Sequence, residues 1–170
     1  VARAMALNVD FAPTFLEACG QQPLREMTGR SFLKLLRGDA EYAARQFVFA
    51  ERGAHGSGLP NGAAPFDLGR VVVGPRYKLI YNALWQLPYQ PVDFNRDAFW
   101  QELQEMNKDG KLSPKMARLY FAPTRPMFEL FDLEADPNEF ENLADSQEHS
   151  AIARELKAAM QEWMILERDF

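Results

Sequence analysis

The stretch from Met127 to Ala144, MFELFDLEADPNEFENLA, constrains the fold of this chain more than any other. In its first half Phe128 and Leu130 fall on one face, without Gly or Pro in the segment, which predicts a β-strand. The residues on the other face are Met127, Glu129, Phe131 and Leu133. The strand must end before Asp136-Pro137, because proline lacks the N–H that a further ladder bond requires. We therefore expect a strand, an acidic turn and a short apolar segment that folds back onto the body.

Three further segments are predicted to be strands. Gln46–Glu51 is apolar and bounded by polar residues, while 70–73 and 77–82 flank the turn-forming sequence Gly-Pro-Arg and predict a hairpin. Residues 52–69 are rich in Gly and Pro, which predicts a loop. Together with 127–133, these segments predict an antiparallel sheet of about four strands.

Helices are expected between and after the strands. Asp97, Ser113 (followed by proline) and Asp145 (with a Glu three residues later) are each suited to begin one. The apolar stripes expected to be buried are Phe99, Leu103 and Met106, then Met116, Leu119 and Tyr120, and finally Ile152, Leu156, Met160 and Trp163. The last stripe is the longest, and we expect it to pack on the sheet.

Two short helices are predicted near the N-terminus. Asp10 is suited to cap the first, with Gly20 at its end, and Ser31 is suited to cap the second, with Gly38 at its end. The residues expected to be buried are Phe11, Phe15, Leu16 and Cys19 in the first helix and Phe32, Leu35 and Leu36 in the second. Cys19 is the only cysteine of the chain, and a buried apolar role is expected for it.

Composition limits the classes of function. The chain has 170 residues, 47% of them hydrophobic, and a net charge of −5, so it can build a core but does not attract polyanions, which disfavours nucleic-acid binding. No apolar run is long enough for a membrane span, and no signal peptide is recognisable. Because the first residues lack an initiator Met, we interpret the chain as a piece of a longer polypeptide.

Several motifs resemble one family. ELFDLEADPNEFENLA resembles the ELYDLxxDPxExxNLA signature of sulfatases, which belong to the alkaline-phosphatase superfamily. NVDFAPTFLEACGQQP resembles the D-x-x-PT-x-L-x-x-AG segment of the family, with Cys19 in place of Ala, and MTGRSFLKLLRG resembles GRS-x-x-x-LL-x-G. The ending EWMILERDF is similar to the family's W-x-x-x-x-x-D tail, and RVVVGPRYKLIYN resembles the branch that contains sulfamidase, the heparan N-sulfatase.

The resemblance implies an α+β architecture, in which a small antiparallel sheet packs against a C-terminal amphipathic helix. Residues 1–40 would be the tail of a larger α/β catalytic domain, and residues 41–170 would form the C-terminal subdomain. The principal partner would be the N-terminal catalytic domain of the same polypeptide. Residence outside the cell or in a lysosome is the habit of the family, and nothing in the sequence assigns a compartment.

The resemblance also implies a reaction, the hydrolysis of sulfate esters or sulfamates, with a sugar as the expected carrier. Sulfatases use a formylglycine made from the cysteine of C-x-P-S-R, beside a calcium ion held by oxygen ligands. Cys19 lies in ACGQQP and does not fit this motif. The nucleophile and calcium are therefore expected in the missing N-terminal domain; this chain is expected to supply no catalytic residue, metal ligand or cofactor, and to be inactive alone.

The candidate binding residues of this chain are Glu51, Arg52 and His55, where a predicted strand leads into the Gly-rich loop. In sulfamidase-like relatives the corresponding loop leans over the active-site pocket. Arg52 can pair with a sulfate through its two-pronged guanidinium group, and His55 can bond a sugar hydroxyl or sulfamate. The expected ligand is a sulfated small molecule or glycan.

Two other functions fit the same sequence. One is a phosphonate or phosphodiester hydrolase of the same superfamily, whose C-terminal sequences look similar. The other is an interaction module without catalytic activity, which would bind a partner through apolar side chains of its first two helices. The acidic segment DLEADPNE lacks the glycine and the final Glu of an EF-hand calcium loop, so a capped turn is the preferred interpretation.

Overall fold

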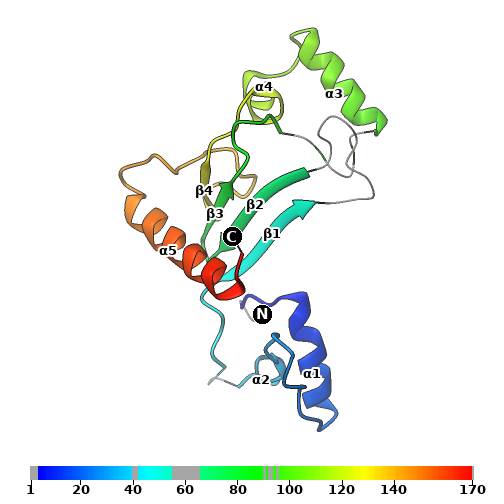
Figure 1. Ribbon diagram of the computed structural model, residues 1–170, viewed down its shortest axis with the longest axis vertical. Coiled ribbons are helices and arrows are strands. Elements are labelled where there is room, and N and C mark those ends of the chain that lie inside the picture. Colours follow the sequence, from blue (N-terminus) through cyan, green and yellow to red (C-terminus); the bar gives the residue numbers. More distant parts are fainter. Residues whose placement is uncertain are drawn as a thin grey trace. The chain divides into compact units, whose positions relative to one another are not determined.

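A computed structural model describes residues 4–39, 42–54, 66–89, 91, 94 and 96–169. The chain divides into two compact units, Val1–Val48 with Val73–Pro75, and Phe49–Val72 with Arg76–Phe170. Each unit is described by itself below. Figure 1 gives the order of the elements along the chain.

The first unit contains a single-turn 3-10 helix, η1 (Asn8–Asp10), followed by α1 (Phe11–Ala18) and α2 (Leu33–Leu36). Gly20 and Gly38 follow the two α-helices with positive φ angles of 73° and 76°, a conformation that favours glycine. The predicted ends of both helices are therefore confirmed.

Asp10 organises this unit, although not as the helix cap that the sequence suggested. Its side chain is 2% exposed, and its carboxylate accepts backbone hydrogen bonds from Leu7 (2.9 Å) and Arg30 (2.7 Å). The Arg45 guanidinium donates to the same carboxylate at 2.5 Å. Burial raises the pKa of Asp10, but these donors outweigh burial and hold that pKa below its ordinary value. One carboxylate therefore ties three separate segments together.

Two further contacts join α1 to the segment that precedes α2. The Thr14 hydroxyl donates to the Asp10 carbonyl at 2.6 Å and accepts from the backbone N–H of Phe32 at 3.1 Å. Gly29 packs so tightly on Val9 that an added Cβ would lie 1.9 Å from the Val9 carbonyl oxygen. The D-x-x-P-T and G-R-S motifs thus have a physical meaning, because each supplies one side of a close contact between segments.

The predicted buried stripe of α1 is wrong. Phe11 and Phe15 are 50% and 64% exposed and Cys19 is exposed, whereas Pro13 and Thr14 are buried. In α2 the buried residue is Leu33, while Leu36 of the expected stripe is exposed. The periodicity identified an apolar face, but that face is only partly covered: Leu16 is half-buried and the Phe32 ring contacts the ring of Phe11, while Phe11 and Phe15 stay largely exposed.

The second unit is built on a four-stranded antiparallel sheet in the order β1-β2-β3-β4. The strands are β1 (Val48–Ala54), β2 (Phe66–Val73), β3 (Tyr77–Asn82) and β4 (Phe128–Asp132), shown from cyan to yellow in Figure 1. The last two pair antiparallel with Leu79 opposite Leu130. The α+β fold expected from the sequence is confirmed.

The predicted loop 52–69 is wrong at both of its ends. β1 continues to Ala54, and β2 begins at Phe66, several residues before the expected start at Arg70. Gly69 lies inside β2, and the Tyr81 carbonyl oxygen of the neighbouring strand is 3.7 Å from where its Cβ would be, which is an ordinary contact distance. Residues 55–65 lie outside the described part of the chain.

Helix α5 (Ser150–Glu167) covers one face of the sheet and packs on β3 (Figure 1). The buried apolar residues of this layer are Leu79 and Leu130 of the sheet and Ala153, Leu156 and Met160 of the helix. Trp163 stacks on Phe49 with ring centroids 5.2 Å apart. The predicted helical stripe is confirmed, but the helix begins after His149 rather than at Asp145, because turns occupy the intervening residues.

The segment after β4 folds back along that strand. The Asp132 carboxylate accepts from the backbone N–H groups of Glu134 and Ala135, which forms the expected acidic turn. The Asn142 side chain then accepts from the Leu130 N–H at 2.9 Å and donates to the Phe128 carbonyl at 3.1 Å. Asn142 therefore takes the hydrogen-bonding positions of a neighbouring strand.

Helices α3 (Ala98–Lys108) and α4 (Pro114–Phe121) lie between β3 and β4 in sequence. Ser113 caps α4 as predicted by accepting from the Met116 N–H. Trp100, 5% exposed, stacks on Phe121 at 5.3 Å and contacts the ring of Tyr120. The expected stripe of α3 is wrong at Phe99, which is exposed, because its neighbour Trp100 points into the aromatic cluster instead.

Candidate functional site

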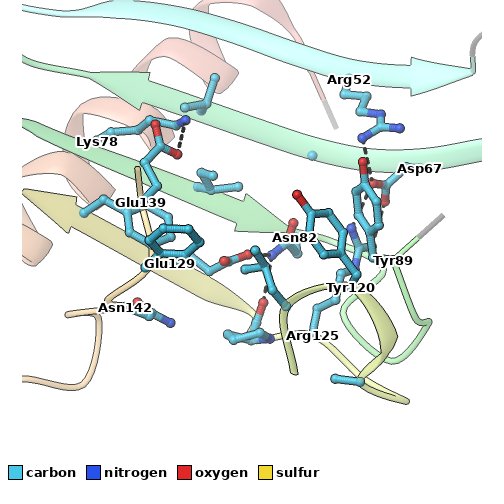
Figure 2. Close-up of a pocket in the computed structure, with 18 of the residues that line it drawn as sticks. Arg52, Asp67, Lys78, Asn82, Tyr89, Tyr120, Arg125, Glu129, Glu139 and Asn142 are labelled. Carbon is cyan, nitrogen blue, oxygen red and sulfur yellow. Dashed lines mark hydrogen bonds and ion pairs between the residues drawn. The ribbon is translucent and has the colours of Figure 1, made fainter. Parts of the chain in front are cut away.

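A cavity of about 1060 Å³ lies on the face of the sheet opposite α5. All four strands contribute to its floor, and α4 and the segment 139–145 contribute to its walls. Figure 2 shows Lys78 at one end, Asn82 near the middle and Asp67 at the other end. Every residue that lines it belongs to the second unit.

The strand alternation explains which side chains reach the cavity. In β3 the residues Lys78, Ile80 and Asn82 line it. Tyr77, Leu79 and Tyr81 alternate with them and face the α5 side, where the Tyr77 ring contacts the ring of His149. In β4 the lining residue Glu129 lies opposite Ile80. The two faces of the sheet therefore differ. The face under α5 is apolar, whereas the face that lines the cavity carries both polar and apolar side chains.

Asn82 and Glu129 form the polar centre of the floor. The Asn82 amide nitrogen donates to Glu129 Oε1 at 2.6 Å and to the Pro126 carbonyl at 2.8 Å. Burial raises the pKa of Glu129, against the opposing effect of the Asn82 hydrogen bond and of Arg125 and Lys78. Glu129 is thus a half-buried carboxylate at the surface of the cavity.

An ion pair marks one end of the cavity. Lys78 Nζ donates to Glu139 Oε2 at 2.6 Å, with both side chains less than one third exposed. Glu139 has a positive φ of 57°, which is unusual for a residue other than glycine. The turn after β4 thereby places a carboxylate against a lysine of the central strand.

A second ion pair marks the other end. Arg125 donates through two nitrogens to the two carboxylate oxygens of Asp67, at 2.7 and 2.8 Å, and also donates to the Leu84 carbonyl. Burial raises the pKa of Asp67, but the Arg125 hydrogen bonds and the charges of Arg125 and Arg52 hold it below its ordinary value. This pair fixes the start of β2 to the segment before β4.

Two of the three predicted binding residues line this cavity. Arg52 lies 3.7 Å from the Asp67 carboxylate, and Glu51 lies 3.9 Å from the guanidinium of Arg70. His55 lies outside the described residues. The structure thus brings Glu51 and Arg52 to one cavity, while their role as substrate ligands stays a prediction.

Sequence reasoning missed Lys78, Asn82 and Glu129 as cavity residues. Their signal was present, since each is a polar residue within a strand that is otherwise largely apolar, and all three fall on the face that lines the cavity. It had no functional interpretation without the pairing of β3 with β4, which brings Asn82 and Glu129 together. Asp67 and Arg125 carried no signal, because they are 58 residues apart in sequence.

Within the described ranges, no three His, Cys, Asp or Glu side chains converge as metal ligands would. Among the helices that the structure describes, none is both long enough and apolar enough to cross a membrane. The cavity contains hydrogen-bonding groups, ion pairs and aromatic rings.

No protein-family model matches the chain. Two curated relatives, both ulvan-active sulfatases of Formosa agariphila, are 32% and 30% identical over 158 and 167 residues. The matches cover 92% and 94% of this chain but 24% and 29% of the relatives. The chain thus spans about a quarter of the length of the curated relatives it matches.

Solved structures share the fold at lower identity. A 2-O GAG sulfatase, BT1596, aligns with a TM-score of 0.61 at 22% identity, covering 94% of this chain and 25% of that protein. A phosphonate monoester hydrolase from Silicibacter pomeroyi aligns with a TM-score of 0.58 at 21% identity, covering 95% and 25%. The sheet and its covering helix are therefore an architecture that both kinds of protein contain.

With this fold, and with relatives that match along nearly its whole length, the chain belongs to the sulfatases of the alkaline-phosphatase superfamily, as a C-terminal part of one. The resemblance drawn from its motifs is confirmed at this level. The sulfamidase-like branch stays a prediction.

Proposed function

We propose that this chain is the C-terminal part of an enzyme that hydrolyses sulfate esters or sulfamates of a sugar, and that it shapes the substrate pocket. The cavity on the sheet supports the proposal most directly, because both Glu51 and Arg52 are among the residues that line it. In this proposal residues 1–40 are the tail of the catalytic domain, and residues 41–170 are the C-terminal subdomain.

The kind of substrate is suggested by the relatives. The two curated relatives are described as active on ulvan, and one solved structure with this fold, BT4656, contains its substrate D-glucosamine-2-N,6-O-disulfate. Both substrates are sulfated sugars. We therefore propose a sulfated saccharide as the ligand, with Arg52 placed to meet its anionic groups.

The reacting groups would come from the rest of the polypeptide. Cys19 lies exposed in ACGQQP and does not belong to a C-x-P-S-R motif. We propose that formylglycine and calcium, which would supply the nucleophile and a Lewis acid, are held by the catalytic domain. The described residues of this chain instead position the saccharide through hydrogen bonds and charge.

The second candidate function is the hydrolysis of phosphonate or phosphate diesters. It is favoured by the likeness in fold to the phosphonate monoester hydrolase. Both candidates place an anionic ester near this chain, so they are separated by substrate and not by the geometry of the cavity.

The test uses the full-length polypeptide that contains this chain. Release of sulfate is measured from ulvan oligosaccharides, from D-glucosamine-2-N,6-O-disulfate and from 4-nitrophenyl sulfate, beside hydrolysis of a phenylphosphonate monoester. Sulfate release is the expected result. Hydrolysis of the phosphonate monoester without sulfate release would favour the second candidate, and no turnover of any substrate would refute both.

Two substitutions test the proposed role of the chain itself. Arg52→Ala and His55→Ala are expected to raise KM without lowering the melting temperature, because an exposed ion pair such as that of Arg52 contributes about 1 kcal/mol or less. Arg154→Ala, on the exposed side of α5, is the control that removes a cation away from the cavity. Unchanged kinetics in both test variants would contradict the role of this segment in binding.

A further inference from the structure

The cavity floor combines polar and apolar side chains. Lys78, Asn82 and Glu129 lie on it beside Ile80 and Phe131, whereas the opposite face of the same strands is apolar and covered by α5. Polar groups with hydrogen-bonding capacity to spare lose their water when a surface without matching partners covers them, which is unfavourable. A small polar molecule, which can return hydrogen bonds to these groups, fits the floor better than another helix or sheet.

The balance of charge in the cavity argues against a sulfate group at its centre. Six lysine or arginine side chains and six aspartate or glutamate side chains are among the described lining residues. Five of the six cations have a carboxylate at 3.9 Å or less. A sulfate at the centre of the floor would face the carboxylate of Glu129 and would meet cations whose charge is already offset by carboxylates, whereas Arg52 lies at the end of the cavity near Asp67.

The same groups suit the hydroxyl groups of an uncharged sugar. A sugar hydroxyl both donates and accepts, so it can donate to the Glu129 carboxylate, which has lone pairs beyond the one used by Asn82. The volume of about 1060 Å³ is close to the upper limit for small-molecule sites, which leaves room for a saccharide.

Aromatic rings complete the site. Tyr89 and Tyr120 line the cavity with their ring centroids 5.9 Å apart, and Trp100 supports Tyr120 from behind through the aromatic cluster. Figure 2 shows both tyrosines at the end of the cavity near Asp67. A ring with an apolar face and a polar hydroxyl can pack against the C–H face of a sugar and bond its edge.

We propose that this cavity is a subsite for an uncharged sugar residue of the glycan, separate from the position of the sulfate that is cleaved, with Glu129 as its central hydrogen-bond acceptor. The proposal rests on the proposed function, in that the ligand is a saccharide. It adds that the C-terminal part selects the substrate by its unsulfated portion.

The experiment measures binding without relying on turnover. Ulvan oligosaccharides that have been chemically desulfated and carboxyl-reduced, and are therefore uncharged, are titrated into the full-length protein by isothermal calorimetry. We expect binding to the unsubstituted protein, and a loss of affinity of about tenfold or more in Glu129→Ala, the size expected for one hydrogen bond to a charged group. Glu162→Ala, which removes a carboxylate from an exposed position of α5, should bind like the unsubstituted protein.

A second variant guards against misfolding of the first. Glu129→Gln retains the shape and the oxygen that accepts from Asn82 but is a weaker acceptor, so it should lose less affinity than the alanine variant. Equal affinity of all variants, or binding that requires the sulfate groups, would overturn the subsite. Sulfate release from intact ulvan oligosaccharides, measured in parallel on the unsubstituted protein, reports the proposed function separately, and its absence alongside binding would refute that function and leave the subsite standing.

Discussion

Replacement of Asp10 by asparagine tests the most connected residue of the first unit. The carboxylate accepts from Leu7, Arg30 and Arg45, and asparagine keeps one acceptor oxygen while replacing the other with a donor. Hydrogen bonds to a charged group contribute about 1.5–3 kcal/mol, and breaking a buried ion pair costs about 3–5 kcal/mol. The Arg45 side chain is 15% exposed, so water can partly replace the lost carboxylate. We therefore expect the substitution to lower the local stability by about 2–4 kcal/mol.

Hydrogen exchange followed by mass spectrometry measures this loss within the unit. In Asp10→Asn, peptides from residues 4–39 should exchange about thirty-fold faster or more, while peptides from residues 76–89 serve as an internal reference. Glu17→Gln, which removes an exposed carboxylate from α1, is the matched control. Equal exchange in Asp10→Asn and Glu17→Gln would refute the assignment of Asp10 as the organising residue.

The same residue predicts a dependence on pH. Since the pKa of Asp10 is below its ordinary value in the folded chain, its contribution is present above the unfolded pKa of about 3.9 and is lost as the pH falls through the lowered folded pKa. Asp10→Asn should lack this acid-dependent component, which Glu17→Gln should retain. An identical acid profile for the two variants would contradict this reasoning.

Two other substitutions test single contacts. Gly29→Ala places a methyl group 1.9 Å from a backbone carbonyl oxygen and should destabilise the first unit by about 1–3 kcal/mol or more. Gly53→Ala, whose methyl group meets open space, is the control and should not be destabilised. Equal melting temperatures for the two variants would contradict the close approach at Gly29. Asn142→Ala removes the acceptor of the Leu130 N–H and should lower the urea midpoint of unfolding by an amount equivalent to about 1–3 kcal/mol. Asn142→Asp should be intermediate, and Asn138→Ala, at an exposed position of the same segment, is the control. A midpoint for Asn142→Ala equal to that of the control would show that the Asn142 side chain does not replace a neighbouring strand.

The sheet was predictable because its signals are local. Residues 77–82 alternate cleanly around a Gly-Pro turn, and the predicted strand agrees with β3 at both ends. Strand β4 and the acidic turn were likewise specified by Phe128, Leu130 and the Asp-Pro sequence. The amphipathic pattern of α5 predicted its buried face, since a long stripe has one way to lie on a sheet.

The cavity and the packing of the first unit were not predictable, because they depend on contacts between distant residues. Asp67 has meaning only beside Arg125, which the sequence places far away. Phe11 and Phe15 were expected to be buried because they share a helical face, but periodicity alone does not say what covers a face. The cap expected at Asp10 was wrong for the same reason, since distant donors outcompeted the nearest amides.

The amide of Asn142 has a consequence for how the sheet meets other polypeptides. It bonds the Leu130 N–H and the Phe128 carbonyl, so these groups on the outer edge of β4 cannot pair with a strand of another polypeptide. Within the described residues, the other edge strand is β1, so a further strand could pair with the sheet only there, beside the charged residues Glu51 and Arg52. The Asn142 side chain, together with the Leu143 N–H that donates to the Leu130 carbonyl, thus closes one edge of the sheet and leaves the other open.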